Sequence, residues 1–333
     1  TCALPISLTV SATGQNKVYD GTTVAPVTLS DNRVAGDTLT LAGTGAFASK
    51  DVGTAKPVNV TGINITGADA GNYTFNTTAT TAADITARTL TVSATGQNKV
   101  YDGGTGATVS FGDNRVSGDA LILAGTASFA DKNVGAAKAV NVTGINVTGG
   151  DAGNYTLGNT TATTTADITA RALTVSATGQ NKVYDGGSSA TVTLGDNRVL
   201  GDALSLSHGA ASFTDKHAGT GKTVNVTGIN VTGTDASNYT FNTTATTAAD
   251  ITPRALTVGG IGISRVYDGT TNASVTPTDN RVAGDVLTLT GTPAFADKHV
   301  GTAKTINITG ITVTGTDAGN YTFNTTAATA ADI

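Results

Sequence analysis

One five-residue stretch recurs along the chain and limits what the chain can fold into. The sequence Lys-Val-Tyr-Asp-Gly at 17–21 returns at 99–103 and at 182–186, and it returns at 265–269 with Arg in place of Lys. Consecutive copies lie 82 or 83 residues apart, and their tyrosines are Tyr19, Tyr101, Tyr184 and Tyr267. A fixed period of this length indicates tandem copies of one structural unit. The 333 residues therefore predict four modules of the same kind.

A second motif recurs with nearly the same spacing. Asp-Ala-Gly-Asn-Tyr-Thr begins at Asp69 and returns at Asp151, at Asp235 with Ser in place of Gly, and at Asp317, and its tyrosines are Tyr73, Tyr155, Tyr239 and Tyr321. It resembles the tyrosine corner of immunoglobulin-like sandwiches, in which a Tyr near the start of a late strand bonds to nearby backbone. We predict a structural role for both motifs: for all eight tyrosines, for Asp20 and Gly21, and for the four aspartates that open the second motif. The apolar residue two positions after each corner tyrosine, such as Phe75, is expected to fill the space between two sheets.

Short apolar–polar alternations between turn residues predict strands throughout each module. In the first module we expect them at 8–12, 24–29, 39–41, 46–47, 58–60, 63–65, 73–75 and 80–85. The apolar phase slips by one residue between 58–60 and 63–65, which predicts a bulge or tight turn at Gly62 and at its equivalents Gly144, Gly228 and Gly310. Glu is absent, Thr and Val are abundant, and no helical stripe is sustained. The expected fold class is all-β, with four immunoglobulin-like β-sandwich repeats in tandem.

The period predicts repeats at 8–88, 89–171, 172–254 and 255–333. Their junctions contain no Gly/Ser-rich tether, so we expect an elongated rod with limited bending. Residues 1–7 lie outside the repeat, and codons for residues 1–6 can be written to match the end of a sequencing adapter. We therefore interpret them as a non-native leader, and we assign no chemistry to Cys2, the only cysteine. Because Met is also absent, the chain is expected to be a fragment whose export signal and anchor lie elsewhere.

Charge and motif content argue against several function classes. The net charge of −5 is spread over interspersed signs, so nucleic acid is not an expected partner. No run of apolar residues is long enough for a membrane-spanning helix. The sequence contains no recognisable catalytic motif, and an active site is rarely needed four times at this spacing. We expect no enzyme activity and no catalytic residues.

Calcium is the one cofactor that the sequence leaves open. Asp20, Asp31, Asp37 and Asp69 lie in predicted loops and recur in each module, and extracellular modules often bind calcium weakly through such oxygens. The alternative is that these aspartates form turns and cap their own backbone. Recurring lysines, Lys50 and Lys56 among them, could form intramolecular isopeptide bonds with Asn or Asp, or could simply be solvated or ion-paired. Both questions stay open at this point.

The motifs taken together resemble a known repeat family. In the fourth module the chain has Val-Tyr-Asp-Gly-Thr-Thr, Val-Ala-Gly-Asp, Ala-Phe-Ala-Asp-Lys-His-Val-Gly-Thr-Ala-Lys and Gly-Thr-Asp-Ala-Gly-Asn-Tyr-Thr-Phe, in that order. This order closely resembles the YDG-domain repeat of very large bacterial surface proteins of the filamentous-haemagglutinin type. The resemblance covers residues 8–333. It implies an exported adhesin or biofilm protein at the cell surface, with these repeats as its stalk, and it brings no catalytic residues.

Two functions from different classes follow. The first is a mechanical spacer, a monomer whose partners are the neighbouring repeats of its own chain, while regions outside this segment contact host glycans or proteins. The second is a multivalent array of weak glycan sites, which would gain avidity from its four copies. Binding measured as a function of repeat number separates them, because a spacer binds nothing by itself.

Overall fold

The computed structural model describes residues 4–333, and it is all-β with four copies of one domain. The predicted fold class and the four repeated domains are confirmed, and the sheets curl into half-barrels. The immunoglobulin-like sandwich and the elongated rod stay predictions. Cys2 and the first part of the proposed leader lie outside the described residues. The chain divides into two compact units, residues 1–169 with repeats 1 and 2 and residues 170–333 with repeats 3 and 4.

The elements of unit 1 follow one order twice. Repeat 1 has β1 (Ile6–Leu8), β2 (Val10–Gly14), β3 (Lys17–Val18), β4 (Val24–Ala25), β5 (Val27–Asp31), β6 (Thr40–Phe47), β7 (Gly53–Thr66), the 3-10 turn η1 (Ala70–Asn72), β8 (Tyr73–Phe75) and β9 (Ala79–Thr86). Repeat 2 has β10 (Arg88–Leu90), β11 (Val92–Gln97), β12 (Lys99–Val100), β13 (Thr108–Asp113), β14 (Ile122–Phe129), β15 (Gly135–Thr148), η2 (Ala152–Asn154), β16 (Tyr155–Leu157) and β17 (Ala162–Thr169).

Unit 2 repeats that order with local differences. Repeat 3 has β18 (Arg171–Leu173), β19 (Val175–Gly179), β20 (Lys182–Val183), β21 (Val192–Asp196), β22 (Ser205–Ser207), β23 (Ala210–Phe213), β24 (Gly219–Thr227), β25 (Asn230–Thr232), η3 (Ala236–Asn238), β26 (Tyr239–Phe241) and β27 (Thr244–Thr252). Repeat 4 has β28 (Arg254–Leu256), β29 (Val258–Ile263), β30 (Ser274–Asp279), β31 (Thr288–Phe295), β32 (Lys304–Thr314), η4 (Ala318–Asn320), β33 (Tyr321–Phe323) and β34 (Ala327–Ala331).

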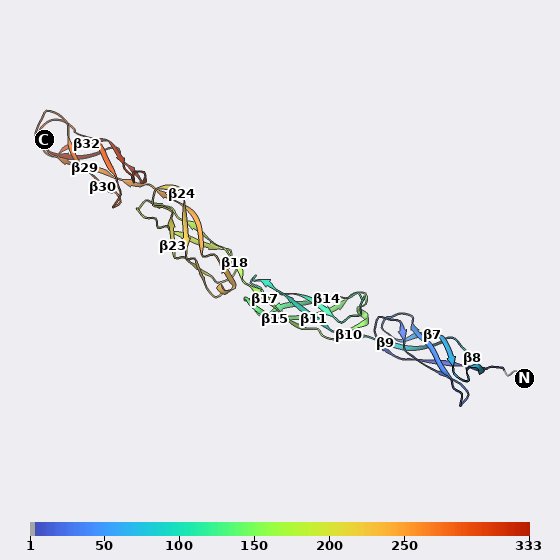
Figure 1. Ribbon diagram of the computed structural model, residues 1–333. Coiled ribbons are helices and arrows are strands. Elements are labelled where there is room, and N and C mark those ends of the chain that lie inside the picture. Colours follow the sequence, from blue (N-terminus) through green and yellow to red (C-terminus); the bar gives the residue numbers. More distant parts are fainter. Residues whose placement is uncertain (1–3) are drawn as a thin grey trace. The chain divides into compact units, whose positions relative to one another are not determined.

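Each repeat buries its apolar residues beneath one larger sheet and one strand pair. In repeat 2 the larger sheet has the order β12-β17-β15-β14, in which β14, β15 and β17 run side by side (Figure 1), and β11 pairs antiparallel with β13. Alternating valines and isoleucines point into the core, and Val140, Val142 and Ile168 are almost fully buried. Because successive strand residues face opposite sides, the Asn and Thr between them face solvent.

The predicted bulge is present and keeps one long strand in register with the core. Along β6 and β7, Ala42 faces Asn64 and Thr44 faces Thr61, so two residues of β7 oppose one residue of β6. Gly62 lies in this bulge with φ 63°, a conformation that glycine adopts at little cost. As a result, the apolar residues on both sides of the slip, at 58, 60, 63 and 65, are all buried. The bulge prediction is therefore confirmed.

The first and last segments of each repeat are held together side by side. In repeat 1, β3 pairs parallel with β9, so that Lys17 lies opposite Ile85, and the Tyr19 N–H donates to the Thr86 carbonyl at 2.9 Å. Upstream of β3, the Asp84 N–H donates to Asn16 Oδ1 at 2.7 Å. β1 pairs parallel with β8, and β10 pairs parallel with β16 in the same way. Strand pairing therefore assigns Ile6 to repeat 1 and Arg88 to repeat 2, because each lies in a strand that pairs with a later strand of that repeat.

One expectation about the core is wrong. The apolar residue two positions after the corner tyrosine does not fill a closed space between the sheets. Phe75 is only half-buried, and its counterpart Phe323 is 37% exposed. The reason is that β8 pairs only with the short β1 and lies outside the larger sheet.

Candidate functional site: the junction between repeats

The corner tyrosine organises a loop at one end of each repeat. In repeat 2 the Val116 N–H donates to the Tyr155 hydroxyl at 2.8 Å, and this hydroxyl donates to Asp119 Oδ2 at 2.6 Å. The backbone partner lies 39 positions upstream, so the tyrosine joins distant segments and does not bond to its immediate neighbourhood. The same two bonds link Tyr73 to Val34 and Asp37 in repeat 1.

An Arg–Asp pair fixes the shape of that loop. Arg115 bonds both oxygens of Asp113, with 2.5 Å from Nη2 to Oδ2, and its Nη1 donates to the Leu121 carbonyl at 2.9 Å. Equivalent pairs are Arg33–Asp31, Arg198–Asp196 and Arg281–Asp279. The hydrogen bonds from Arg115 outweigh burial and lower the pKa of Asp113, so this carboxylate stays charged. Side-chain bonds therefore hold the loop in one shape where it presents Val116 and Asp119.

The tyrosine of the five-residue motif reaches out of its own repeat into this loop. Tyr19, from repeat 1, places its hydroxyl 2.9 and 3.0 Å from the two carboxylate oxygens of Asp119 in repeat 2. Its ring meets the ring of Tyr155 edge-on, with centroids 5.5 Å apart. Tyr19 is only 1% exposed. The motif is thus a joint between consecutive repeats.

A lysine of repeat 1 also contacts this aspartate of repeat 2. Lys50 Nζ lies 2.8 Å from Asp119 Oδ1 and 2.9 Å from Asp151 Oδ1, and it sits 5.7 Å from the centre of the Tyr19 ring. The Val52 N–H donates to Asn154 Oδ1 at 3.0 Å. We name Tyr19, Gly21, Lys50 and Val52 the donor face, and Val116, Asp119, Asp151 and Asn154 the acceptor face.

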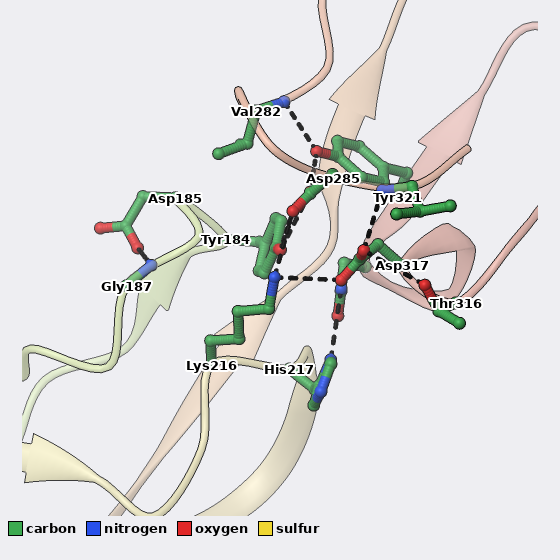
Figure 2. Close-up of polar contacts among 12 residues, drawn as sticks. Tyr184, Asp185, Gly187, Lys216, His217, Val282, Asp285, Thr316, Asp317 and Tyr321 are labelled. Atoms are coloured by element: carbon green, nitrogen blue, oxygen red, sulfur yellow. Dashed lines mark hydrogen bonds and ion pairs between the residues drawn. The ribbon is translucent and has the colours of Figure 1, made fainter.

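Unit 2 builds the same joint between repeats 3 and 4 (Figure 2). The Tyr184 hydroxyl lies 2.9 and 3.0 Å from the oxygens of Asp285, and the Tyr321 hydroxyl donates to Asp285 at 2.6 Å. Lys216 Nζ lies 3.1 Å from Asp285 and 3.1 Å from Asp317. The rings of Tyr184 and Tyr321 are again edge-on at 5.5 Å. Two independent copies of one geometry show that the arrangement follows from the repeated residues.

The acceptor carboxylate is buried and nevertheless ionised. Burial alone would raise the pKa of Asp119, but hydrogen bonds from Lys50, Tyr155 and Tyr19 outweigh burial and lower it below its ordinary value. Burial and the bond to Asp119 raise the pKa of Tyr155 to about 12. The bonds to Asp119, Tyr19 and Asp151 raise the pKa of Lys50. At neutral pH the joint therefore holds one buried anion between two neutral hydroxyls and one ammonium group.

Repeats 1 and 4 also contain residues equivalent to those of the joint. In repeat 4, Tyr267 of the five-residue motif is 50% exposed. In repeat 1, Asp37 and Val34 occupy the positions of Asp119 and Val116, and Val34 is half exposed. Among the other motif residues, Tyr101 and Tyr239 are buried, and the Tyr239 hydroxyl donates to Asp202 at 2.6 Å.

The four calcium candidates are spread over different contacts. Asp20 pairs with Lys17 at 2.8 Å and Asp69 accepts the Thr38 N–H at 2.9 Å, while Asp31 and Asp37 belong to the loop described above. Within residues 4–333 no group of three or more His, Cys, Asp or Glu could hold a metal ion. Among the lysines considered for isopeptide bonds, Lys50 and Lys56 take part in ion pairs or hydrogen bonds, and Lys138 lies 2.7 Å from Asp131.

The sequence pointed to the individual residues of the joint but did not connect them. The recurring loop aspartates, such as Asp37, and the recurring lysines, such as Lys50, can be identified in the sequence. Their fourfold recurrence was the available signal. Recurrence alone does not show that the donor face of one repeat pairs with the acceptor face of the next.

Gly21 offers a test of this close approach. A Cβ on Gly21 would lie 2.7 Å from Val116 Cγ1, and its φ is 79°. Gly269 has nearly the same φ, 81°, but a Cβ there meets nothing within 4 Å. In both Gly→Ala variants the alanine must adopt a left-handed backbone conformation, which lowers the free energy of unfolding by about 1–2 kcal/mol. Only Gly21→Ala must also displace Val116, which lowers it by about a further 1–3 kcal/mol. Urea midpoints of the two units should show the larger drop for Gly21→Ala, and equal drops would contradict a tight joint.

Comparison with known proteins gives one family. The sequence profile described as "YDG domain" matches residues 4–82, 86–165, 169–248 and 252–330. The chain matches no curated protein by sequence. Residues 4–333 contain no helix with the length and hydropathy needed to span a bilayer.

Among solved structures the likeness is weak. Drosophila N-cadherin EC1-3 is 9% identical over 72% of this chain and 98% of its own, with a TM-score of 0.19. A titin I9-I11 tandem is 10% identical over 75% of this chain and 97% of its own, with a TM-score of 0.17. Domains 4-9 of the surface layer protein SbsC are 12% identical over 94% of this chain and 65% of their own, with a TM-score of 0.17. At such TM-scores the likeness carries no argument about fold or function.

Proposed function

The chain belongs to the YDG domain family, and we propose that its four repeats are a tension-bearing spacer in an exported bacterial surface protein. In this role the repeats hold an adhesive region, encoded outside this segment, away from the cell. Their direct partners are neighbouring repeats of the same chain. The observation that carries the proposal is the way in which each repeat holds its own two ends.

Parallel end strands resist tension because they are loaded in shear. In repeat 1 the early strand β3 pairs parallel with the last strand β9, and β1 pairs parallel with β8. A force that pulls the two ends apart slides such strands along each other, so their hydrogen bonds must break together. Antiparallel end strands joined at a hairpin would open one bond at a time, at lower force.

Side chains add to this clamp. The Val10 N–H donates to Asn76 Oδ1 at 2.7 Å, and Asn76 Nδ2 returns a bond to the Val10 carbonyl at 3.0 Å. The same pair of bonds recurs at Asn159, Asn242 and Asn324. The N-terminal strand β2 is thereby tied to the segment that leads into β9.

The joint continues the connection from repeat to repeat. Within unit 1, β9 ends at Thr86 and β10 begins at Arg88. The donor and acceptor faces then bury a tyrosine and an ion network at this connection. A short connection with a buried contact favours transmission of force over free swivelling.

Pulling single molecules of the chain from its two ends tests the proposal. We expect separate unfolding events, each releasing one repeat, or up to roughly 270–295 Å of chain at ~3.3–3.6 Å per residue. In Asn76→Ala, one event should move to lower force, while Asn72→Ala, which removes an exposed asparagine of η1 on the other side of β8, serves as the control. Featureless extension at low force would contradict a tension-bearing role.

The burial of the tyrosines gives little support to the second function, a multivalent glycan array. Seven of the eight motif tyrosines are buried, so their rings are not available as stacking platforms. A glycan array would show binding that weakens stepwise as repeats are removed, and the proposed spacer would show none.

A further inference from the structure

We propose that repeat 4 contains a binding pocket for a small aromatic molecule, between the strand pair β29–β30 and the sheet that contains β31 and β32. The pocket has a volume of about 400 Å³, within the range of roughly 300–1,000 Å³ that is typical of small-molecule sites. Within residues 4–333, its lining comes from repeat 4 alone, and no lining residue is equivalent to a residue of the donor or acceptor face. The inference goes beyond the spacer role and does not rest on it.

One core-facing position of the strand pair differs between repeat 4 and the other repeats. Leu29 in repeat 1, Phe111 in repeat 2 and Leu194 in repeat 3 occupy this position, each opposite an alanine of the neighbouring strand, and all three are half-buried. In repeat 4 the position holds Pro277, which lies opposite Gly260 and is exposed. Repeat 4 thus has a small side chain where the other repeats have a large apolar one.

The glycines beneath this position show which space becomes free. A Cβ on Gly43 would lie 3.2 Å from Leu29 Cδ1, and a Cβ on Gly125 would lie 3.2 Å from Phe111 Cζ. In repeats 1 and 2 the large side chain therefore packs directly on the glycine. At the equivalent Gly291, the nearest atoms to such a Cβ belong to β32 instead. The space that an isobutyl group fills in repeat 1, and a phenyl ring in repeat 2, is thus open in repeat 4.

This open space reaches the core of repeat 4. The pocket lining includes Val258, Ile308 and Ile311, whose exposed fractions are 5%, 4% and 3%. In repeat 1 a hollow of about 460 Å³ lies at the same place, but its lining includes Leu29 and Arg33 and none of the equivalent core residues of the described chain. The two hollows therefore differ in depth, because Leu29 separates the hollow of repeat 1 from the core.

The lining of the pocket indicates the chemistry of its ligand. Within the described chain, no charged side chain lines the pocket of repeat 4, and Ser274 and Thr290 supply its hydroxyl groups. Burial of apolar surface is favourable, and apolar cavities in protein cores bind benzene. Phe111 shows that this place in the fold accepts a phenyl ring. A single aromatic ring with a small substituent therefore matches the pocket in size and in chemistry.

The rim of the pocket favours a free small molecule over a bound peptide strand. Among the described strands, β30 pairs only with β29, and β31 lies at the edge of its sheet. Such edges can accept a further strand, but Pro277 in β30 and Pro293 in β31 carry no N–H. An extended peptide therefore cannot form a continuous ladder of hydrogen bonds along either edge.

Titration of the whole chain with toluene tests the inference, with the methyl groups followed by NMR. We expect saturable shifts at Leu289 and Ile311, with a dissociation constant on the order of 0.1–1 mM. Repeat 2 is the internal control, because Phe111 fills the same place there, so the methyl groups of Leu123 and Ile145 should show no saturable shift. Absence of saturable shifts in repeat 4, or equal shifts in both repeats, overturns the proposal.

Substitutions that copy the other repeats separate the pocket from unspecific binding. Pro277→Leu installs the residue of repeats 1 and 3 and should weaken toluene binding by about tenfold or more, because leucine fills the pocket. Pro277→Phe, with the residue of repeat 2, is a second filling variant and should do the same. Ile261→Thr removes an exposed apolar side chain of β29, again installs the residue of the other repeats, and should bind toluene like the parent chain.

Urea midpoints of the filling variants show whether a loss of binding is specific. We expect these midpoints to stay equal or to rise, because the added side chain fills a hollow. Full toluene affinity in both filling variants, or loss of affinity in Ile261→Thr, contradicts the proposed site. A short alanine peptide with a central phenylalanine should bind no more tightly than toluene, and tighter binding of the peptide would contradict the assignment to a free small molecule.

Discussion

Replacing Asp119 with Ala should destabilise unit 1 by about 3–5 kcal/mol, the cost of breaking a buried charged network by removing one partner. The carboxylate is buried and accepts bonds from the Tyr19 and Tyr155 hydroxyls and from Lys50. Its loss leaves two hydroxyls without their acceptor in a buried place. Lys50 is 36% exposed on its side chain, so water can solvate it and its share of the loss is small.

Hydrogen exchange resolved along the chain measures this effect. In Asp119→Ala, amides around Tyr19 and Val116 should exchange faster, and urea unfolding of repeats 1 and 2 should separate into two transitions. The joint around Asp285 in unit 2 is an internal control, because its residues are unchanged. Asp37→Ala is the matched variant: the same position in repeat 1 lacks the incoming tyrosine and lysine, so its cost should be smaller. Equal costs for the two variants would show that the joint adds nothing.

The pH dependence of the same variant has a definite sign. Asp119 has a lowered pKa in the folded chain, so its contribution is complete above the unfolded value of about 3.9 and is lost as pH falls through the folded value. Asp119→Ala should therefore differ most from the parent chain near neutral pH and converge with it in acid. At the alkaline end, the raised pKa of Tyr155 makes its contribution disappear between about pH 10, the usual tyrosine value, and about 12.

Tyr19→Ala should cost about 3–5 kcal/mol, as expected for truncating a buried aromatic side chain. The ring is almost fully buried against Tyr155 and beneath the Lys50 ammonium, and its hydroxyl bonds Asp119. Loss of the side chain leaves a cavity within the joint and removes the edge-on ring contact. The measurement is the free energy of urea unfolding, followed by exchange at repeats 1 and 2.

Tyr267→Ala is the matched control for this prediction. Tyr267 occupies the same place in the same motif, but it is 50% exposed, so its removal should cost less than about 1 kcal/mol in the dilute chain. Tyr19→Phe separates the two parts of the effect: it keeps the ring and removes one bond to a charged group, worth about 1.5–3 kcal/mol. If Tyr19→Ala and Tyr267→Ala had equal effects, the tyrosine would be acting within its own repeat and not in the joint.

Local patterns were enough to predict much of each repeat. The alternation of Val and Ile with Asn and Thr places residues such as Val58 and Val60 on one buried face, since side chains of a strand alternate. The one-residue slip at Gly62 predicted the bulge because a slip without it would turn Ile63 and Ile65 to solvent. Both predictions depend on neighbours close in sequence. The burial of Phe75 cannot be predicted in this way, because it depends on which strand β8 pairs with.

By itself, the sequence determined the period, the all-β class and the residues that recur, because these are properties of short stretches and of their spacing. Only the tertiary structure decided what the recurring residues do. The hydroxyl of Tyr19 and the carboxylate of Asp119 are 100 positions apart, and a strand pattern carries no information about which repeat a side chain will enter. Equivalent tyrosines therefore differ in burial within the described residues: Tyr19 is buried in a joint, whereas Tyr267 is half exposed. The physical reason is that burial depends on what packs against a residue, and for these tyrosines it depends on the presence of another repeat's acceptor face.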